Sequence, residues 1–209
     1  MNFLVIEGNI GAGKTTLAKM ISNDYNAQFV GETFADNPFL EKFYNDPKGY
    51  AFTLEMSFMA ERYSQLIVEL QNRDLFKDFA IADYYFMKSL IFSSVTLSID
   101  EYNLYRKFFD IIYSRLPRPD LYVYLHKSTS NLQRQIKERG REYEQNISDD
   151  YLENISQAYF SFFKQQSEFP VLIIDTNEID FVNNKRDYLK ICEVIFQGSY
   201  PTGISRVIM

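Results

Sequence analysis

Residues 2–7, NFLVIE, and residues 8–16, GNIGAGKTT, follow one another at the start of the chain and decide its fold. The second stretch fits the spacing G-x-x-x-x-G-K-[ST], with Gly8, Gly13, Lys14 and Thr15 in the fixed positions. An apolar strand before the loop and the helical pattern KTTLAKMISNDY after it supply the context that this motif requires. The sequence therefore predicts a P-loop that holds a nucleoside triphosphate, and with it a P-loop NTPase fold.

The residue types of the loop indicate how it binds phosphate. Glycines allow backbone N–H groups to curl around phosphate oxygens, and the following helix adds its positive N-terminal end. Lys14 is expected to reach the outer phosphates of ATP, and the Thr15 hydroxyl to bind Mg²⁺. The predicted nucleotide contacts form one continuous run: Gly8, Asn9, Ile10, Gly11, Ala12, Gly13, Lys14, Thr15 and Thr16.

Composition limits the class of protein. With 209 residues, 46% of them hydrophobic, the chain is long enough for one well-cored α/β domain. The net charge of −6 argues against nucleic acid as a partner, and no apolar run approaches the length of a membrane span. The single cysteine, Cys192, fits a reducing cytoplasm. The single histidine, His126, is expected to end a strand rather than to act as a base.

Short apolar runs alternate with helical patterns along the chain, which predicts right-handed crossovers and a parallel sheet. Strands are expected at 2–7, 27–31, 78–83, 120–125 and 170–175. Helices are expected at 14–24, 37–45, 48–72, 86–97, 100–116, 129–139, 149–167 and 186–196. We therefore predict a single P-loop domain over 1–209, with a doubly wound five-stranded parallel sheet flanked by helices. The tail, 198–209, fits either a loose end or a contact arm.

Two short patterns behind the P-loop suggest a GTPase as an alternative. DPKG at 46–49 matches D-x-x-G, and NKRD at 184–187 matches N-K-x-D. In a GTPase both motifs end strands, whereas DPKG here follows a helical pattern and NKRD lies where a helix begins. We therefore interpret both matches as coincidental.

Two acidic residues end strands next to the predicted P-loop. In a doubly wound sheet, ligands bind at the carboxyl ends of the strands, so Glu32 and Asp83 are expected to point toward the phosphates. A carboxylate at Glu32 can accept the proton of an attacking hydroxyl, although a surface glutamate fits that position as well. Asp83 is expected to complete the Mg²⁺ site with Thr15, a role compatible with an N-cap for the helix at 86–97.

The helix at 48–72 and the segment after 134 offer two further candidates. Glu55 and Arg62 share one helix face with Phe58, which suits a pocket for a flat base but also fits an ordinary core stripe. The basic segment RQIKERGR, with Arg139 and Arg141 around a glycine, predicts an arginine-bearing lid over about 134–147. A solvated charged loop is the alternative for that segment.

Nearly the whole chain resembles the deoxyribonucleoside kinase family, most of all its bacterial deoxyadenosine/deoxyguanosine kinase branch. The resemblance is carried by FLVIEGNIGAGKTT, by ADNPFLEKFYNDPKGYAFTLEMSFMAERY and by ERGREYEQNISDDYLENISQAY. It implies transfer of phosphate from ATP to the 5′-hydroxyl of a deoxyribonucleoside, with Mg²⁺, in proteins that are commonly dimers. It also implies site roles: Glu32 as general base, Tyr44 and Glu144 on the sugar 3′-hydroxyl, Glu55 and Arg62 facing the base, Arg139 and Arg141 as lid cations, and Asp180 and Phe181 beside the donor adenine.

The sequence departs from the family pattern at several positions. Tyr84 stands where the family has an arginine between the base carboxylate and the phosphates, and we count it with the substrate-binding residues. Lys88, one helical turn on, is a candidate to return that cation. Glu55 replaces a glutamine that reads the base, which favours deoxyguanosine over deoxyadenosine. Gln135 and Thr33 replace an arginine and a proline.

These departures leave two alternatives to an active purine deoxynucleoside kinase. One is a degenerate kinase fold that binds nucleotide as a sensor or partner subunit, which Tyr84 and Gln135 favour. The other is a different small-molecule kinase on the same fold, which the long helix at 48–72 disfavours.

Overall fold

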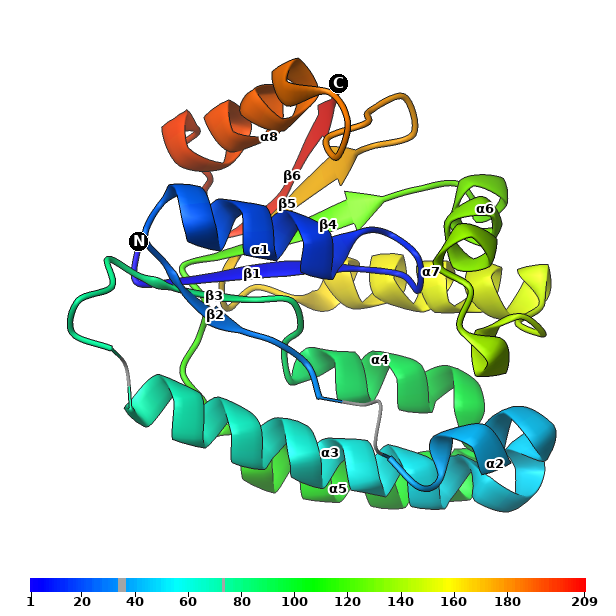
Figure 1. The fold of residues 1–209 in the computed structure, drawn as a ribbon. Helices are drawn as coiled ribbons and strands as arrows, with labels where there is room; N and C mark the ends of the chain where they lie inside the picture. Colours follow the sequence, from blue (N-terminus) through cyan, green and yellow to red (C-terminus); the bar gives the residue numbers. More distant parts are fainter. Residues whose placement is uncertain (34–36, 73) are drawn as a thin grey trace.

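The computed structural model describes residues 1–33, 37–72 and 74–209. Its centre is a six-stranded sheet in the order β2-β3-β1-β4-β5-β6, in which every neighbouring pair is parallel (Figure 1). The strands are β1 (Phe3–Gly8), β2 (Gln28–Val30), β3 (Ala80–Ala82), β4 (Leu121–His126), β5 (Pro170–Asp175) and β6 (Gly203–Ile208).

Helices cover both faces of the sheet (Figure 1). They are α1 (Lys14–Asp24), α2 (Leu40–Asn45), α3 (Pro47–Gln71), α4 (Met87–Thr96), α5 (Ile99–Tyr113), α6 (Thr129–Arg139), α7 (Asp149–Gln165) and α8 (Lys185–Gln197), with a 3₁₀ turn, η1 (Glu142–Glu144). All eight helices expected from the sequence are present, with bounds shifted by at most a few residues. The first two residues of the family segment ADNPFLEKFYNDPKGYAF, Ala35 and Asp36, lie outside the described residues.

Hydrophobic core lies on both sides of the sheet, and β1 is therefore buried along its full length. Leu4 and Ile6 pack on the side of α1 and α8, whereas Phe3 and Val5 pack on the side of α4 and α7. A strand buried on both faces has no polar alternation, which is why residues 2–7 form one apolar run. This arrangement brings the carboxyl ends of β1, β2 and β3 to one edge of the sheet, where the P-loop begins.

The sheet has one strand more than the five predicted. The tail forms β6, which pairs in parallel with β5 from Pro170 opposite Gly203 to Asp175 opposite Ile208. The question left open for residues 198–209 is therefore answered by an edge strand. The sequence did not reveal it because its apolar residues do not mark a buried face: Ile204 and Ile208 are exposed, with Ser205 and Val207 half-buried between them.

The two GTPase-like patterns begin helices. The Asp46 side chain caps the first turn of α3, and Pro47 occupies the first helical position. Asn184 caps α8 in the same way, through its side chain and the Arg186 N–H. Neither pattern ends a strand, as the sequence interpretation predicted. No helix within the described ranges is long and apolar enough to cross a membrane.

Candidate active site

The P-loop connects β1 to α1 with glycines in conformations that other residues avoid. Gly11 and Gly13 have φ angles of 84° and 89°, and Gly13 is the residue that precedes α1. Lys14 Nζ donates to the Asn9 carbonyl at 2.9 Å, within the loop. Burial lowers the pKa of Lys14 to about 8, and the nearby Lys88 adds to that effect. Binding of a phosphate would therefore stabilise the charged form of Lys14, which burial and Lys88 destabilise.

Asn9 fastens the loop to α7. Its side-chain amide donates to the Leu152 carbonyl at 2.7 Å and to Ser156 Oγ at 2.8 Å, and its side-chain Oδ1 accepts from the Ile10 N–H. Asn9 was predicted as a nucleotide contact, and the structure gives its side chain a different partner. Its backbone remains part of the loop.

Asp83 joins the P-loop to the end of β2. The Thr15 hydroxyl donates to one Asp83 carboxylate oxygen, and the other accepts from the Glu32 N–H at 2.7 Å. Asp83 does not cap α4, whose first residue follows Phe86. Among the described residues no group of three acidic, histidine or cysteine side chains gathers. A hydroxyl and one carboxylate nevertheless fit Mg²⁺, which binds through one or two carboxylates plus phosphate oxygens.

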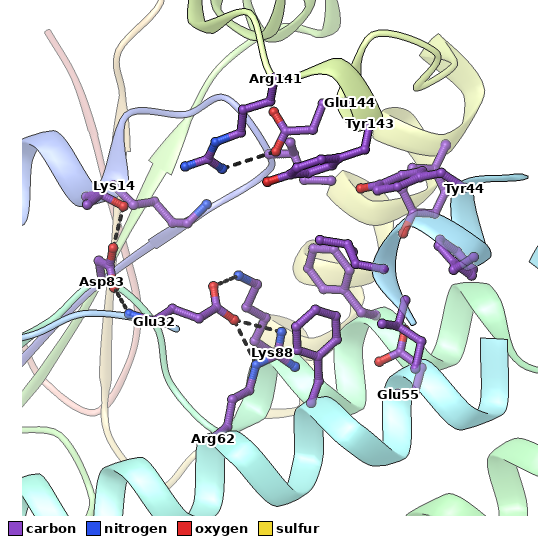
Figure 2. Close-up of a pocket in the computed structure, with 18 of the residues that line it drawn as sticks. Lys14, Glu32, Tyr44, Glu55, Arg62, Asp83, Lys88, Arg141, Tyr143 and Glu144 are labelled. Carbon is purple, nitrogen blue, oxygen red and sulfur yellow. Dashed lines mark hydrogen bonds and ion pairs between the residues drawn. The ribbon is translucent and has the colours of Figure 1, made fainter. Parts of the chain in front are cut away.

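Glu32 lies between two buried cations (Figure 2). Its Oε1 accepts from Arg62 Nη2 at 2.8 Å and Nε at 2.9 Å, and its Oε2 accepts from Lys88 Nζ at 2.5 Å. Burial alone would raise the pKa of Glu32, but Lys88 and then Arg62 outweigh it and hold the pKa at about 2. Glu32 is therefore a carboxylate throughout the physiological range.

The Lys88 side chain reaches the cavity, whereas the Tyr84 side chain does not. The Tyr84 side chain is fully buried, its hydroxyl has no hydrogen-bond partner among the described residues, and it does not line the cavity. Lys88 lines the cavity, pairs with Glu32 and lies 5.5 Å from the centroid of the Phe92 ring. Of the two, only Lys88 is therefore placed to act on a ligand in the cavity.

Arg62 is turned toward Glu32 rather than toward Glu55. Besides its bonds to Glu32, it donates from Nη1 to Ser89 Oγ at 2.8 Å, and its guanidinium lies 4.7 Å from the Phe58 ring centroid. No ion pair joins Arg62 to Glu55 within the described chain. Arg62 also lines the cavity, so its predicted role beside the base stays a prediction.

Glu55 lies at the opposite end of the cavity from Lys14, with aromatic rings between them (Figure 2). The glutamate is buried, and its Oε1 accepts from Thr96 Oγ1 at 2.9 Å. Its Oε2 has no hydrogen-bond partner among the described residues. Burial raises the pKa of Glu55 to about 7, opposed by Arg62 and by the Thr96 hydrogen bond.

The predicted lid closes the upper side of the cavity (Figure 2). Gly140 ends α6 in a left-handed conformation with φ 72°, and both Arg139 and Arg141 then pair with the buried Glu144. The ring of Tyr44, from α2, stacks on Tyr143 with centroids 6.1 Å apart. The structure thus brings together the residues that sequence reasoning assigned to the sugar and to the lid.

Asp180 and Phe181 do not line this cavity. Phe181 is buried, and a Cβ added at Gly13 would come 2.9 Å from its ring. Asp180 is exposed and accepts from the backbone and side chain of Asn183. Phe181 thus lies beside the P-loop, and the role of both residues at the donor adenine stays a prediction.

Sequence reasoning missed part of the cavity wall. These lining residues are mostly apolar or aromatic: Leu40, Phe43, Leu54, Phe92, Tyr143 and Tyr151. Such side chains look like core residues in a sequence, because nothing in their spacing separates a cavity wall from a packed interior. Tyr143 had one signal, its place between the lid residues Arg141 and Glu144.

Comparison with known proteins agrees with this geometry. The family model for deoxynucleoside kinases matches residues 4–197. The chain belongs to the deoxynucleoside kinase family. This confirms the resemblance carried by the P-loop, the long helix and the lid segment, and it makes the chain a member of a family of transferases.

Several relatives of this deoxynucleoside kinase are named after a purine deoxynucleoside. It is 39% identical over 194 residues to a deoxyguanosine kinase of Bacillus subtilis (strain 168), covering 90% of this chain and 93% of that one. It is 33% identical over 183 residues to a deoxyadenosine kinase of Dictyostelium discoideum, covering 84% and 72%. The deoxyadenosine kinase from M. mycoides, 28% identical, superimposes with a TM-score of 0.81 in a structure with the products dCMP and dCDP, which covers 94% of this chain and 100% of that one. A structure of the same protein with bound dATP gives a TM-score of 0.80, covering 92% and 98%.

Proposed function

We propose that this deoxynucleoside kinase transfers the terminal phosphate of ATP to the 5′-hydroxyl of a purine deoxyribonucleoside, with Mg²⁺. The observation that carries the proposal is the position of Glu32. It lies in one cavity between the phosphate-binding side chains Lys14 and Thr15 and the buried Glu55. A carboxylate in that position stands where an acceptor hydroxyl and a transferable phosphate meet.

The donor end of the site is built from the P-loop. Backbone N–H groups of residues 8–16, the α1 N-terminus and Lys14 supply positive charge for the triphosphate. Thr15 and Asp83 would hold Mg²⁺, which when bound neutralises charge on the phosphates. The M. mycoides relative solved with dATP supports a nucleotide-binding role for this fold.

Glu32 acts as the general base on the acceptor, and its two cations serve both the base and the phosphates. With a pKa of about 2, Glu32 is always ionised but is a weak base while both cations hold it. A phosphate group at the cavity competes for Arg62 and Lys88, and any loss of their contact raises the basicity of Glu32. The carboxylate therefore orients the hydroxyl first and accepts its proton late.

Glu144 is assigned to the sugar and is also the ion-pair partner of the lid arginines. Tyr44 and Glu144 are assigned to the 3′-hydroxyl, and Arg139 and Arg141 to the transferred phosphate. In the structure both arginines pair with Glu144. A bound sugar hydroxyl can replace the arginines as partner of Glu144, while a bound phosphate replaces Glu144 as partner of the arginines. Lid closure is thereby coupled to occupation of both sites.

Lys88 supplies the cation that Tyr84 does not. Lys88→Met is expected to lower kcat on the order of 10²-fold, because it removes one of the two cations on Glu32 and on the incoming phosphate. Adding Tyr84→Arg is expected to recover part of the loss. Steady-state kinetics of both variants measure this, with Lys107→Met on the exposed face of α5 as the matched control. A Lys88→Met enzyme with wild-type turnover, and no gain from Tyr84→Arg, contradicts the compensation.

Glu55 favours guanine over adenine. An ionised carboxylate has acceptors only, and guanine presents two adjacent donors, N1–H and the 2-amino group, for a bidentate charge-assisted pair. Adenine sets a ring-nitrogen lone pair against one of the oxygens. The unpartnered Oε2 and the absence of an Arg62–Glu55 ion pair within the described residues support this assignment.

Glu55→Gln is therefore expected to shift the ratio of kcat/KM values toward deoxyadenosine, on the order of 10²-fold at pH values where Glu55 is fully ionised. Measuring kcat/KM for both purine deoxynucleosides in wild type and variant tests this. Glu193→Gln, an exposed change on α8, is the control. An unchanged ratio removes Glu55 from base recognition.

One experiment tests the proposed function as a whole. The protein is incubated with ATP, Mg²⁺ and each of the four deoxynucleosides, and monophosphate products are separated. We expect products from deoxyguanosine and deoxyadenosine. No product from any acceptor would favour the degenerate fold that serves as a sensor or partner subunit. A homodimer in the cytoplasm is the assembly and location that we propose with this activity.

A further inference from the structure

Glu55 is a buried carboxyl whose surroundings fix it neither in the protonated nor in the ionised form. Only 2% of the residue is exposed, and the single hydrogen bond that its side chain makes within the described residues comes from Thr96. The two cations nearest to it, Arg62 and Lys88, are both bound to Glu32. Glu55 therefore lacks the direct ion pair that would fix it as a carboxylate.

Titratable groups face Glu55 from every element around it. Arg62 on its own helix and Lys88 on α4 favour its ionised form, whereas Glu32 opposes it. The phenols around it are neutral at physiological pH because burial raises the pKa of each: Tyr44 on α2, Tyr105 on α5 and Tyr151 on α7. The cations and the burial work against each other, which sets the proton equilibrium of Glu55 near neutrality, at a pKa of about 7.

Thr96 accommodates both forms of the carboxyl. Its hydroxyl lies 2.9 Å from Glu55 Oε1 and 3.1 Å from the Phe92 carbonyl, and it has one proton to donate. It can donate to an ionised Glu55, or donate to Phe92 and accept from a protonated one. Neither form leaves the hydroxyl unsatisfied, so Thr96 does not force a choice.

The two forms of the carboxyl match different bases. Ionised Glu55 pairs with N1–H and the 2-amino group of guanine, and Oε1 has a second lone pair for this while it accepts from Thr96. Protonated Glu55 has one donor and one acceptor, so it can donate to adenine N1 and accept from the 6-amino group. The protonated form can also donate to guanine O6 and accept from N1–H. Adenine thus needs the proton, and guanine does not.

We propose that the proton on Glu55 decides which purine deoxynucleoside this kinase accepts, so that the preference for deoxyguanosine grows with pH. This rests on the proposed function, because it concerns the acceptor site of the same reaction. The protonated fraction falls about tenfold per pH unit above the pKa of the group. The kcat/KM for deoxyadenosine falls with it, while the value for deoxyguanosine is sustained by the ionised form.

The ratio of the two kcat/KM values isolates this effect. Protonation of Lys14, of the lid or of ATP changes both acceptors equally and cancels in the ratio. Between about pH 6 and about pH 8 we expect the deoxyguanosine to deoxyadenosine ratio to rise, approaching about tenfold per pH unit on the alkaline side. Glu55→Gln, which keeps a donor and an acceptor at every pH, should give a flat ratio.

Thr96→Val separates proton control from simple packing. The substitution keeps the shape but removes a hydrogen bond that favours the ionised form, so the rise in the ratio should move to higher pH. Dissociation constants of the two nucleosides without ATP should follow the same pH dependence. This second measurement judges the proposal even for an enzyme that transfers no phosphate.

The outcomes are distinct. A flat wild-type ratio, or a Glu55→Gln ratio as steep as the wild type, overturns the proton control while both purines are still phosphorylated and the proposed function stands. Failure of phosphorylation with pH-dependent binding overturns the proposed function alone. A protein that binds neither nucleoside at any pH overturns both.

Discussion

Glu32→Gln is expected to lower kcat on the order of 10²–10⁴-fold and to leave the affinity for ATP nearly unchanged. The amide cannot take the 5′-hydroxyl proton, and it leaves Arg62 and Lys88 without the carboxylate that they share. Among the described residues, the hydrogen bond that joins Glu32 to the donor site comes from its backbone N–H, which reaches Asp83 and is retained in the variant. Single-turnover kinetics and an ATP titration measure the two quantities separately.

A matched control keeps this result specific. Glu193→Gln makes the same chemical change on the exposed side of α8 and should behave as wild type. Because two buried cations lose their partner in Glu32→Gln, thermal unfolding of both variants must accompany the kinetics. Wild-type turnover in a folded Glu32→Gln enzyme would remove this carboxylate from the mechanism.

Lys14→Ala is expected to abolish phosphoryl transfer, with a loss of at least about 10³-fold. Lys14 is the fixed cation of the P-loop, and in the structure it is held by its own loop at the Asn9 carbonyl rather than by an acidic side chain. It is therefore ready for the outer phosphates without first breaking an ion pair. Product formation from deoxyguanosine measures the effect.

Lys19→Ala serves as the comparison for this change. Lys19 is exposed on the same helix, where it lies over the Phe29 ring, so its loss alters charge near the loop without touching phosphate. Activity that survives Lys14→Ala while Lys19→Ala is neutral would show that residues 8–16 are not the donor site.

The fold was predictable because its main signals are local. β1 and the P-loop combine an apolar strand, the G-x-x-x-x-G-K-[ST] spacing and glycines with positive φ angles, and few other structures share this combination. The same is true of the helix at 47–71, whose start is fixed by Asp46 and Pro47. β6 was not predictable, because an edge strand with exposed isoleucines lacks the one-sided pattern from which strands are inferred.

The positions of Glu32 and Asp83 in the structure were predictable from the sequence, but the pairings of the candidate site residues were not. Strand ends placed Glu32 and Asp83 correctly beside the loop, since topology alone brings them there. Helical spacing put Arg62 on the face of Glu55, but which carboxylate a guanidinium binds depends on three-dimensional distance and charge. Glu32 offers an ionised oxygen within 2.8 Å, whereas Glu55 is bound to Thr96. The same reason explains Lys88, whose role depends on reaching Glu32 across elements 56 residues apart.

The packing around the P-loop has a consequence for the thermodynamics of nucleotide binding. An added Cβ at Gly8 would meet the Leu125 carbonyl at 2.8 Å, one at Gly11 the Leu132 carbonyl at 2.9 Å, and one at Gly13 the Phe181 ring. The loop is enclosed on its outer side and fastened through Asn9, so its backbone has already lost its conformational freedom when the chain folds. A triphosphate that binds there encounters preorganised N–H donors and little ordering entropy opposes it. The lid is different, since no atom of the described residues lies within 4 Å of a Cβ added at Gly140. The entropic cost of forming the ternary complex should therefore fall on ordering the lid rather than on ordering the P-loop.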